Sequence, residues 1–257
     1  MSPFKFRPTA LDSPAILVYS GATSVGLFAI ELAKTLRTPS GKPYRIFATA
    51  SPKNHTKLLS LGVEAVFDYR SPTWPEEARE ASGGISYAVD CISEDNSTAH
   101  IPQTFVEGGG KIAVIRKAAW NREGVRSDVT PLYGAVWVGL GHEIMYNGMF
   151  LSSILPGSRL ICHTTGEILP ASPLWRDLTV AFFRYLSGGS PTDPTRFPIA
   201  ANPIRLMPGG LDRIVPDAFA LIGSGKVSDR VLYEKEYGSR PWMRPISGEK
   251  LVYRIGE

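Results

Sequence analysis

Seven residues near the start of the sequence, Ser-Gly-Ala-Thr-Ser-Val-Gly at 20–26, have the composition of a phosphate-binding turn. Glycines allow a tight bend and let backbone N–H groups approach a pyrophosphate, which then lies at the positive end of a helix. The turn departs from the G-x-G-x-x-G pattern, because Thr23 and Ser24 occupy its middle. Their hydroxyls can donate to phosphate oxygens or cap the helix. Taken alone, the turn fits an ordinary capped helix as well as a dinucleotide site.

A second group of polar residues, Ser51, Lys53 and Asn54, follows the next apolar segment of the chain. An NAD site places Asp or Glu at this position to accept hydrogen bonds from the ribose, whereas a 2′-phosphate requires cations and neutral donors. Residues 48–54 contain no carboxylate. If a nicotinamide cofactor binds, the pattern therefore predicts NADP; the alternative is a polar loop that contains a lysine by chance.

Both groups must be positioned by strands and helices. Apolar residues at 16–19 predict a strand, and apolar residues with helical spacing at 25–36 predict a helix. Further strands are predicted at 44–50, 63–69, 85–92 and 109–115, with a helix between the first two of these that ends at Gly62. Strands that alternate with crossovers predict an α/β fold of the Rossmann type, a doubly wound, mostly parallel sheet with helices on both faces.

The remaining sequence is less regular. It predicts a possible strand at 135–140, a helix at 174–189 that packs on the sheet, a helix at 208–228 that Pro216 kinks or begins, and a strand near the C-terminus. We expect a short N-terminal arm at 1–15 and a single dinucleotide-binding domain at 16–257, with a variable segment at about 118–173.

Composition excludes several classes of protein. The net charge is +4, but 28 basic and 24 acidic residues are scattered without a polybasic run, which disfavours nucleic acid as a partner. No apolar segment has membrane-spanning length, and no secretory signal is present, so we expect a cytoplasmic protein without a membrane partner. Two cysteines and four histidines without metal-ligand spacing predict no metal site.

The order of these segments resembles a known family. The segments are ILVYSGATSVGLFAIELAK, ATASPKN, GVEAVFDYRSP, YAVDCIS, GGKIAVI, PIRLMPGGLDRI and ISGEKLVYRI. Together they resemble the medium-chain dehydrogenase/reductase superfamily, and most closely the trans-acting enoyl reductases that serve fungal polyketide synthases. The resemblance covers most of the chain and is strongest at 16–115 and 202–214.

The resemblance implies a set of NADP contacts. The pyrophosphate would lie on the turn, the 2′-phosphate on the loop after the second strand, the adenosine phosphate beside an aromatic ring, and the nicotinamide near the C-terminal segment. The residues at these positions are, in that order, Ala22, Thr23, Ser24 and Val25; Ser51, Lys53 and Asn54; Tyr69; and Ile246 and Ser247. Because residues 227–233 resemble 246–253, Val227 and Ser228 are rivals for the last place.

The chain also departs from that family. Full members carry a GroES-like catalytic domain ahead of the first strand, where this chain has 15 residues. The family's catalytic residues therefore have no counterpart here, and the catalytic residues stay unknown.

Three functions remain open. The first is an NADPH-dependent enoyl reductase-like oxidoreductase in a polyketide or polyketide-peptide pathway, which the NADP-type donors favour. The second is a non-redox, pericyclase-like cyclase acting on a polyene product, which an aromatic-rich middle segment favours. The third is a non-catalytic accessory subunit.

The expected partners are a polyketide-type small molecule or carrier-bound thioester, a polyketide synthase, and a second copy of the chain in a homodimer. The aromatic residues of the middle segment, which favour the cyclase, are Trp120, Tyr133, Trp137, Tyr146 and Phe150.

Overall fold

The computed structural model describes seven stretches of the chain: 13–94, 96–115, 126–133, 136–146, 167–186, 199–222 and 240–255. The chain forms two compact units, one of residues 1–133 with 199–257 and the other of residues 134–198. The single domain expected at 16–257 stays a prediction.

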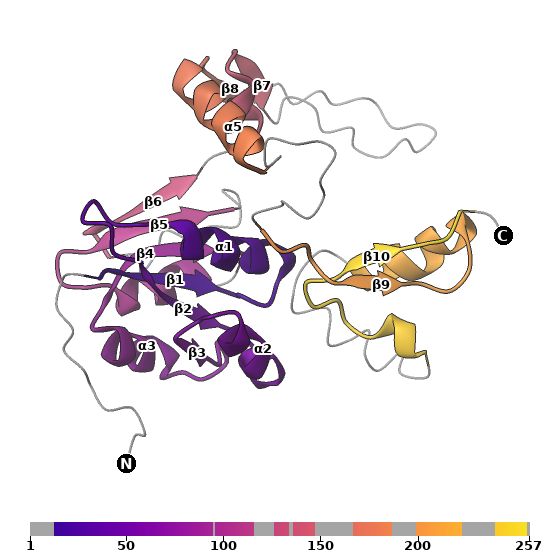
Figure 1. Ribbon diagram of the computed structural model, residues 1–257, viewed down its shortest axis with the longest axis horizontal. Helices are drawn as coiled ribbons and strands as arrows, with labels where there is room; N and C mark the ends of the chain where they lie inside the picture. The colour runs from indigo at the N-terminus through magenta and orange to yellow at the C-terminus, as the bar shows by residue number, and fades with distance from the viewer. Residues whose placement is uncertain are drawn as a thin grey trace, which may run out of the picture. The chain divides into compact units, whose positions relative to one another are not determined.

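A parallel sheet is the centre of the larger unit (Figure 1). Its strand order is β3-β2-β1-β4-β5-β6, and every neighbouring pair is parallel. The predicted Rossmann-type fold is thereby confirmed. The strands are β1 Ala15–Tyr19, β2 Arg45–Thr49, β3 Ala65–Phe67, β4 Ile85–Asp90, β5 Gly110–Val114 and β6 Val129–Tyr133.

Strand β6 is absent from the sequence-based prediction. Its sequence is VTPLY, and the proline at its centre argues against a strand because proline cannot donate a ladder hydrogen bond. Among the described strands β6 pairs with β5 alone, at one edge of the sheet. An edge strand needs donors on one side only, which is how Pro131 is accommodated.

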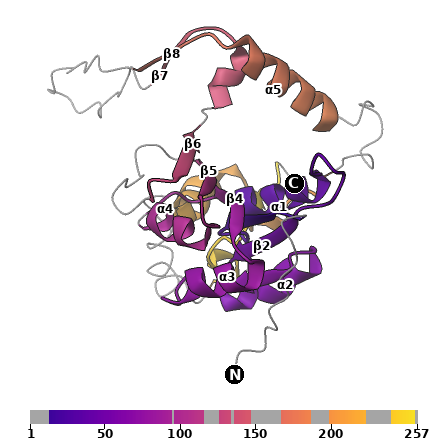
Figure 2. The same cartoon turned by 90° about the vertical axis from the view of Figure 1, so that its left-hand side faces the viewer.

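Helices cover both faces of the sheet. In Figure 2, α1 and α2 lie on one side of the strands and α4 lies on the other. The glycine at 62, with φ +91°, lies just after α2, where the helix was predicted to end. The helical segments of this part are α1 Ser24–Thr35, η1 Pro52–Asn54, α2 His55–Ser60, α3 Trp74–Ser82, α4 Ser97–His100 and η2 Ile101–Thr104.

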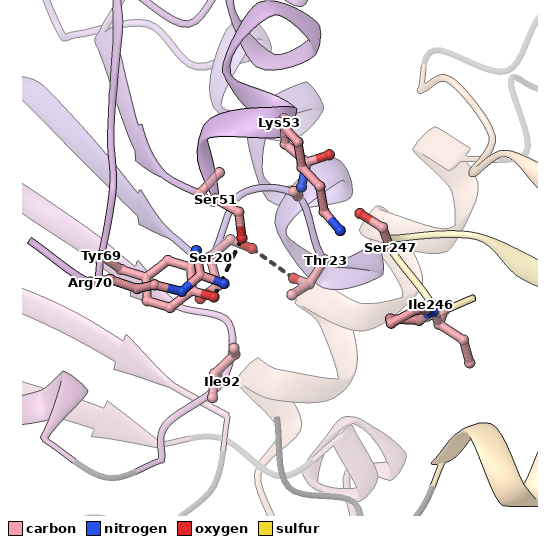
Figure 3. A pocket seen from close by; sticks show the side chains of 13 residues that line it. Ser20, Thr23, Ser51, Lys53, Tyr69, Arg70, Ile92, Ile246 and Ser247 are labelled. Atoms are coloured by element: carbon pink, nitrogen blue, oxygen red, sulfur yellow. Dashed lines mark hydrogen bonds between the residues drawn. The ribbon is translucent and has the colours of Figure 1, made fainter. Parts of the chain in front are cut away.

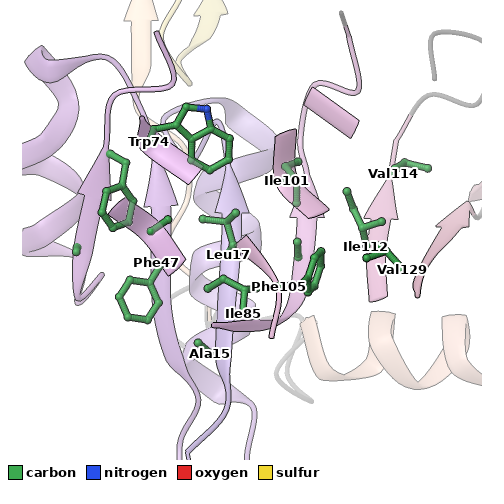
Figure 4. Packing of buried hydrophobic residues seen from close by; sticks show 14 residues of the cluster. Ala15, Leu17, Phe47, Trp74, Ile85, Ile101, Phe105, Ile112, Val114 and Val129 are labelled. Carbon is green, nitrogen blue, oxygen red and sulfur yellow. The ribbon is translucent and has the colours of Figure 1, made fainter. Parts of the chain in front are cut away.

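Each face of the sheet buries its own apolar cluster. On one face Trp74 of α3 and Ile101 and Phe105 pack against strand residues such as Leu17 and Ile112 (Figure 4). On the other, Leu27 and Ile30 of α1 and Leu58 of α2 pack against Val18. A parallel sheet buried on two sides reads as a nearly continuous apolar run, which is why β1 was easily predicted from its sequence.

The C-terminal part of the larger unit is a two-stranded parallel ribbon with short helical turns. The ribbon consists of β9 Ile204–Leu206 and β10 Lys250–Val252. The turns are η5 Leu211–Arg213, η6 Ile214–Phe219, α6 Ala220–Ile222 and η8 Pro241–Met243. Pro216 lies within η6, which is a π-helical turn. A wider turn relieves the ring's clash with the preceding turn, so the proline distorts this helix and does not begin it.

The smaller unit contains η3 Val136–Leu140, β7 Ile144–Tyr146, β8 Glu167–Leu169 and α5 Pro173–Leu186. Strands β7 and β8 are antiparallel. The helix predicted at 174–189 is present as α5; its packing on the sheet stays a prediction. The strand suggested at 135–140 is wrong over the described residues 136–140, which form the 3₁₀ turn η3.

Candidate functional site

A pocket of about 160 Å³ lies where the carboxyl ends of the strands meet (Figure 3). We call it the strand-end pocket. It lies at the point where the strand order reverses between β1 and β4, which is where doubly wound sheets bind ligands. The lining residues are Ser20, Ala22, Thr23, Ala50, Ser51, Lys53, Asn54, Tyr69, Arg70, Ile92, Pro245, Ile246 and Ser247.

The turn after β1 is held tightly against β2. The backbone N–H of Ser20 donates to the Thr49 hydroxyl at 2.8 Å, and the N–H of Gly21 donates to the Thr49 carbonyl at 2.9 Å. Ser20 has a φ of 61°, which is uncommon for a residue other than glycine. A Cβ on Gly26 would lie 2.5 Å from the Ser20 carbonyl oxygen, so only glycine lets the helix approach the turn this closely.

The two hydroxyl residues in the middle of the turn have different roles. Thr23 caps α1: its hydroxyl accepts from the N–H of Gly26 at 3.0 Å and donates to the Ser20 carbonyl at 2.8 Å. Its only hydroxyl proton is therefore in use. The Ser24 hydroxyl accepts from the Asn202 amide, which leaves its own proton available to an acceptor. Neither Ser24 nor Val25 belongs to the pocket lining.

The loop after β2 supplies the polar wall of the pocket. Ser51 precedes η1, and Pro52 is the first residue of this turn. Because the proline ring fixes φ, the backbone that carries the next side chains is conformationally restricted. The ring of His55 donates from Nε2 to the Ala50 carbonyl at 3.0 Å, which closes the loop on itself. All three predicted residues of this loop, Ser51, Lys53 and Asn54, line the pocket.

The turn after β3 adds an aromatic ring and a second cation. The Tyr69 hydroxyl lies 3.4 Å from the Ser51 hydroxyl, which joins this turn to the loop after β2. The Arg70 guanidinium lies over the Tyr69 ring, with Cζ 4.7 Å from the ring centroid. Tyr69 was predicted at the site and Arg70 was not. The signal was present as the step Asp-Tyr-Arg, in which a cation follows the aromatic residue.

The loop after β4 forms the floor of the pocket through Ile92. The buried carboxylate of Asp90 accepts hydrogen bonds from the N–H groups of Ile92 and Ser93 and from the Ser97 hydroxyl, at 3.1, 2.7 and 2.6 Å. Burial raises the pKa of Asp90, although these hydrogen bonds oppose the increase. Asp90 therefore shapes the loop and is not among the residues that line the pocket.

The fourth wall comes from the C-terminal segment, where Ile246 and Ser247 line the pocket. Gly248 lies against the turn after β1, since a Cβ there would be 2.8 Å from the Ala22 carbonyl oxygen. Glu249 holds the bend by accepting from the Ser247 N–H at 3.2 Å. The rival pair Val227 and Ser228 lies outside the described residues.

A second hollow, of about 690 Å³, lies on the α1 face of the sheet. We call it the apolar groove. Its lining includes Val25 and Phe28 of α1 and Tyr87 and Leu132 of the sheet, all of them at least one-third exposed, and Lys111 is its single charged residue. It offers almost no hydrogen-bond donors or acceptors and is therefore unsuited to phosphate. Of the aromatic residues predicted to form an apolar pocket, Tyr133 packs against the sheet core, and the side chains of the others are outside the described set.

The strand-end pocket has the donor set that a dinucleotide phosphate requires. The described residues that line it include the cations Lys53 and Arg70 and several hydroxyls, and none of them is an Asp or Glu. The close approach of Gly26 to Ser20 holds the start of α1 against this turn. The N–H groups of Gly26 and Leu27 donate to Thr23, so the N–H groups of Ser24 and Val25 are the ones that this helix end could offer to a phosphate. The volume is below the roughly 300–1,000 Å³ of sites that enclose a whole ligand, so it suits one end of a dinucleotide.

Two searches of the described residues were negative. No group of three His, Cys, Asp or Glu side chains in these stretches could hold a metal ion. Within the same stretches, none of the helices combines the length and apolarity that crossing a membrane requires.

Comparison with known proteins places the chain near a group of fungal enzymes. No family model matches it. Trans-enoyl reductase gkaC of Penicillium citrinum is 28% identical over 97% of this chain and 56% of its own length. Trans-enoyl reductase xenG of Xenoacremonium sinensis is 29% identical over 93% of this chain and 53% of its own length. The chain thus spans about half the length of these relatives.

Solved structures give the same picture for the fold. The crystal structure of the CurK enoyl reductase matches with a TM-score of 0.53 and 17% identity, over 94% of this chain and 56% of that one. The JamJ enoyl reductase matches with a TM-score of 0.53 and 13% identity, over 95% of this chain and 56% of that one. Over nearly its full length the chain therefore resembles the fungal trans-enoyl reductases, and it shares the Rossmann-type fold of enoyl reductases of known structure.

Proposed function

We propose that the chain binds NADPH in the strand-end pocket and provides the cofactor-binding part of an enoyl reductase that acts on polyketide-type substrates. The observation that carries this proposal is the loop after β2, where Ser51, Lys53 and Asn54 face the pocket without a neighbouring carboxylate in its lining. A carboxylate at this place would repel a 2′-phosphate, whereas a lysine and neutral donors bind it.

NADPH is larger than the pocket, so residues of the pocket and of the adjacent start of α1 would contact different parts of the cofactor. The first turn of α1 and Ala22 would hold the pyrophosphate, with the Ser24 hydroxyl as an additional donor. Lys53, with Ser51 and Asn54, would bind the 2′-phosphate, and Tyr69 would lie beside the adenosine. Ile246 and Ser247 would lie toward the nicotinamide.

When bound, NADPH would supply a hydride to the carbon–carbon double bond of an enoyl thioester. None of the described residues that line the pocket is a His, Asp, Glu or Cys, and its proton donors Lys53 and Tyr69 would lie at the adenosine end of the cofactor. The pocket therefore binds and orients, and the groups that contact the substrate and deliver its proton would come from elsewhere. A carrier-bound thioester, a polyketide synthase and a second copy of this chain are the partners we propose, in the cytoplasm.

Calorimetric titration of the purified chain with NADPH and with NADH tests the proposal. We expect tighter binding of NADPH, and a Lys53→Ala variant should lose about tenfold in NADPH affinity, the usual effect of removing one charge-assisted hydrogen bond. Lys57→Ala is the matched control, because Lys57 lies one helical turn further on and does not line the pocket. Consumption of NADPH with enoyl thioesters, in the presence of the synthase, then tests the reaction.

The titration also separates the alternatives. If neither cofactor binds, the redox function is refuted, and a cyclase or an accessory subunit without a cofactor becomes the better account. A cyclase of this kind would need apolar walls and no 2′-phosphate site, so binding of NADPH argues against it.

A further inference from the structure

Arg70 is the second cation among the described residues that line the strand-end pocket. It belongs to the turn after β3, and it lines the pocket together with Lys53, which comes from the loop after β2. The carboxyl ends of β2 and β3 are adjacent in the sheet. The two cations therefore approach the pocket from neighbouring strands, one on each side of the paired hydroxyls of Ser51 and Tyr69 (Figure 3).

The guanidinium of Arg70 is held in one orientation by its surroundings. It stacks over the Tyr69 ring, and the Tyr69 ring meets Tyr19 edge-on at a centroid distance of 6.4 Å. Tyr19 in turn lies 5.6 Å from Trp74, which is only 1% exposed. A chain of rings thus connects Arg70 to the buried core, so less side-chain entropy is lost when it binds a ligand.

The ion pair of Arg70 leaves most of its donors available. Its Nη1 lies 3.6 Å from Asp68 Oδ1, a distance longer than a hydrogen bond, and its side chain is 55% exposed. Asp68 Oδ1 also accepts from the Arg70 backbone N–H at 3.1 Å. A guanidinium carries five N–H donors in a planar fork that matches phosphate oxygens. Asp68 therefore orients Arg70 without saturating it.

We propose that Arg70 is a specificity-determining residue that binds the 2′-phosphate of NADPH opposite Lys53, while its plane stays stacked on Tyr69. A 2′-phosphate carries close to two negative charges at neutral pH, and two cations on opposite sides match that charge better than Lys53 alone. The inference rests on the proposed NADPH site. It adds that selection against NADH depends on both loops and not on the loop after β2 by itself.

The experiment compares Arg70→Ala and Arg70→Lys with wild type by calorimetric titration. The ligands are NADPH, NADH, and the fragments adenosine 2′,5′-bisphosphate and adenosine 5′-phosphate. We expect Arg70→Ala to weaken NADPH and the bisphosphate about tenfold and to leave NADH and adenosine 5′-phosphate nearly unchanged. Arg70→Lys should restore part of the loss. Arg79→Ala on α3 removes the same charge from an exposed position outside the pocket and serves as the control.

The outcomes separate this inference from the proposed function. If wild type prefers NADPH and Arg70→Ala keeps the full preference, the role of Arg70 is refuted and the NADPH site stands. An equal loss for both cofactors also refutes it, because Arg70 would then act on the common adenosine. If wild type binds neither cofactor, the proposed function fails and the inference fails with it. Circular dichroism melting of each variant verifies that it is folded.

Discussion

The contact between Gly248 and the turn after β1 allows a sharp test of how the strand-end pocket is assembled. Gly248 has a φ of +72°, and a Cβ there would lie 2.8 Å from both the Ala22 carbonyl oxygen and Leu27 Cδ1. Gly83, at the end of α3, has the same φ of +72°, but a Cβ there would meet nothing within 4 Å. Alanine at these two glycines imposes the same backbone strain, and only Gly248→Ala adds a steric clash.

The expected magnitudes follow from this difference. An L-residue in the left-handed region costs about 1–2 kcal/mol, so Gly83→Ala should lower the free energy of unfolding by about that amount. Gly248→Ala should lower the free energy of unfolding by the same amount and by roughly 1–3 kcal/mol more, because an extra carbon is forced into a packed contact. Relief of the clash moves the segment that carries Ile246 and Ser247 away from the turn. Affinity for NADPH should therefore fall about tenfold in Gly248→Ala and stay unchanged in Gly83→Ala.

Urea unfolding gives the two free energies, and calorimetric titration gives the two affinities. Equal destabilisation by the two alanines would show that Gly248 makes no close contact with the turn. Normal NADPH affinity in a destabilised Gly248→Ala protein would show that the C-terminal segment is not a wall of the cofactor site. Either result refutes the reasoning at a different step.

Two further predictions concern the pH dependence of stability at two carboxylates, the buried Asp90 and the partly buried Glu249. Burial raises the pKa of Asp90 above its ordinary 3.8, so ionisation of this carboxyl group disfavours the folded state. The free energy of unfolding of wild type, relative to that of Asp90→Asn, should therefore fall as pH rises from about 3.8 through the raised pKa. Urea unfolding at several pH values measures this difference, and a difference that stays constant with pH would contradict the prediction. Burial also acts to raise the pKa of Glu249, but hydrogen bonds from Arg244 and Arg205 outweigh it and lower the pKa below 4.5. Wild type should therefore lose stability relative to Glu249→Gln as pH falls below about 4.5 through the lowered pKa. Thermal melting at several pH values measures this, and a difference in melting temperature between the two proteins that does not change with pH would show that the pairing has no effect.

Most of the sheet could be predicted because its strands are buried on both faces. Strands β1 to β5 are short apolar runs bounded by Gly, Pro or polar residues, which is the pattern that local rules detect. Strand β6 was not predicted, because a proline such as Pro131 argues against a central strand. The proline is tolerated because β6 lies at an edge of the sheet, which the local sequence does not indicate. The segment at 136–140 is as apolar as a strand, and no local signal distinguishes it from the 3₁₀ turn that it forms.

The candidate site was predictable where it depends on local chemistry. The loop at 51–54 lines the pocket as expected, because its residues directly follow a strand end. Thr23 and Ser24 were indistinguishable in sequence, yet one caps the helix and the other is bonded to Asn202 from a distant segment. The segment with Ile246 and Ser247 lies at the pocket beside the contact of Gly248 with Ala22, and no local pattern encodes that long-range contact.

That same contact joins residues from distant parts of the chain, and this has a consequence for biosynthesis. The ribosome produces the turn after β1 long before it reaches Gly248, and domains begin to fold from the N-terminal side during translation. The sheet can therefore form while one wall of the pocket is still missing. Closing so long a loop is slow, which makes the pocket a late product of folding. A ligand that binds the completed pocket would then stabilise only finished chains, so its supply should affect their turnover and not the early folding steps.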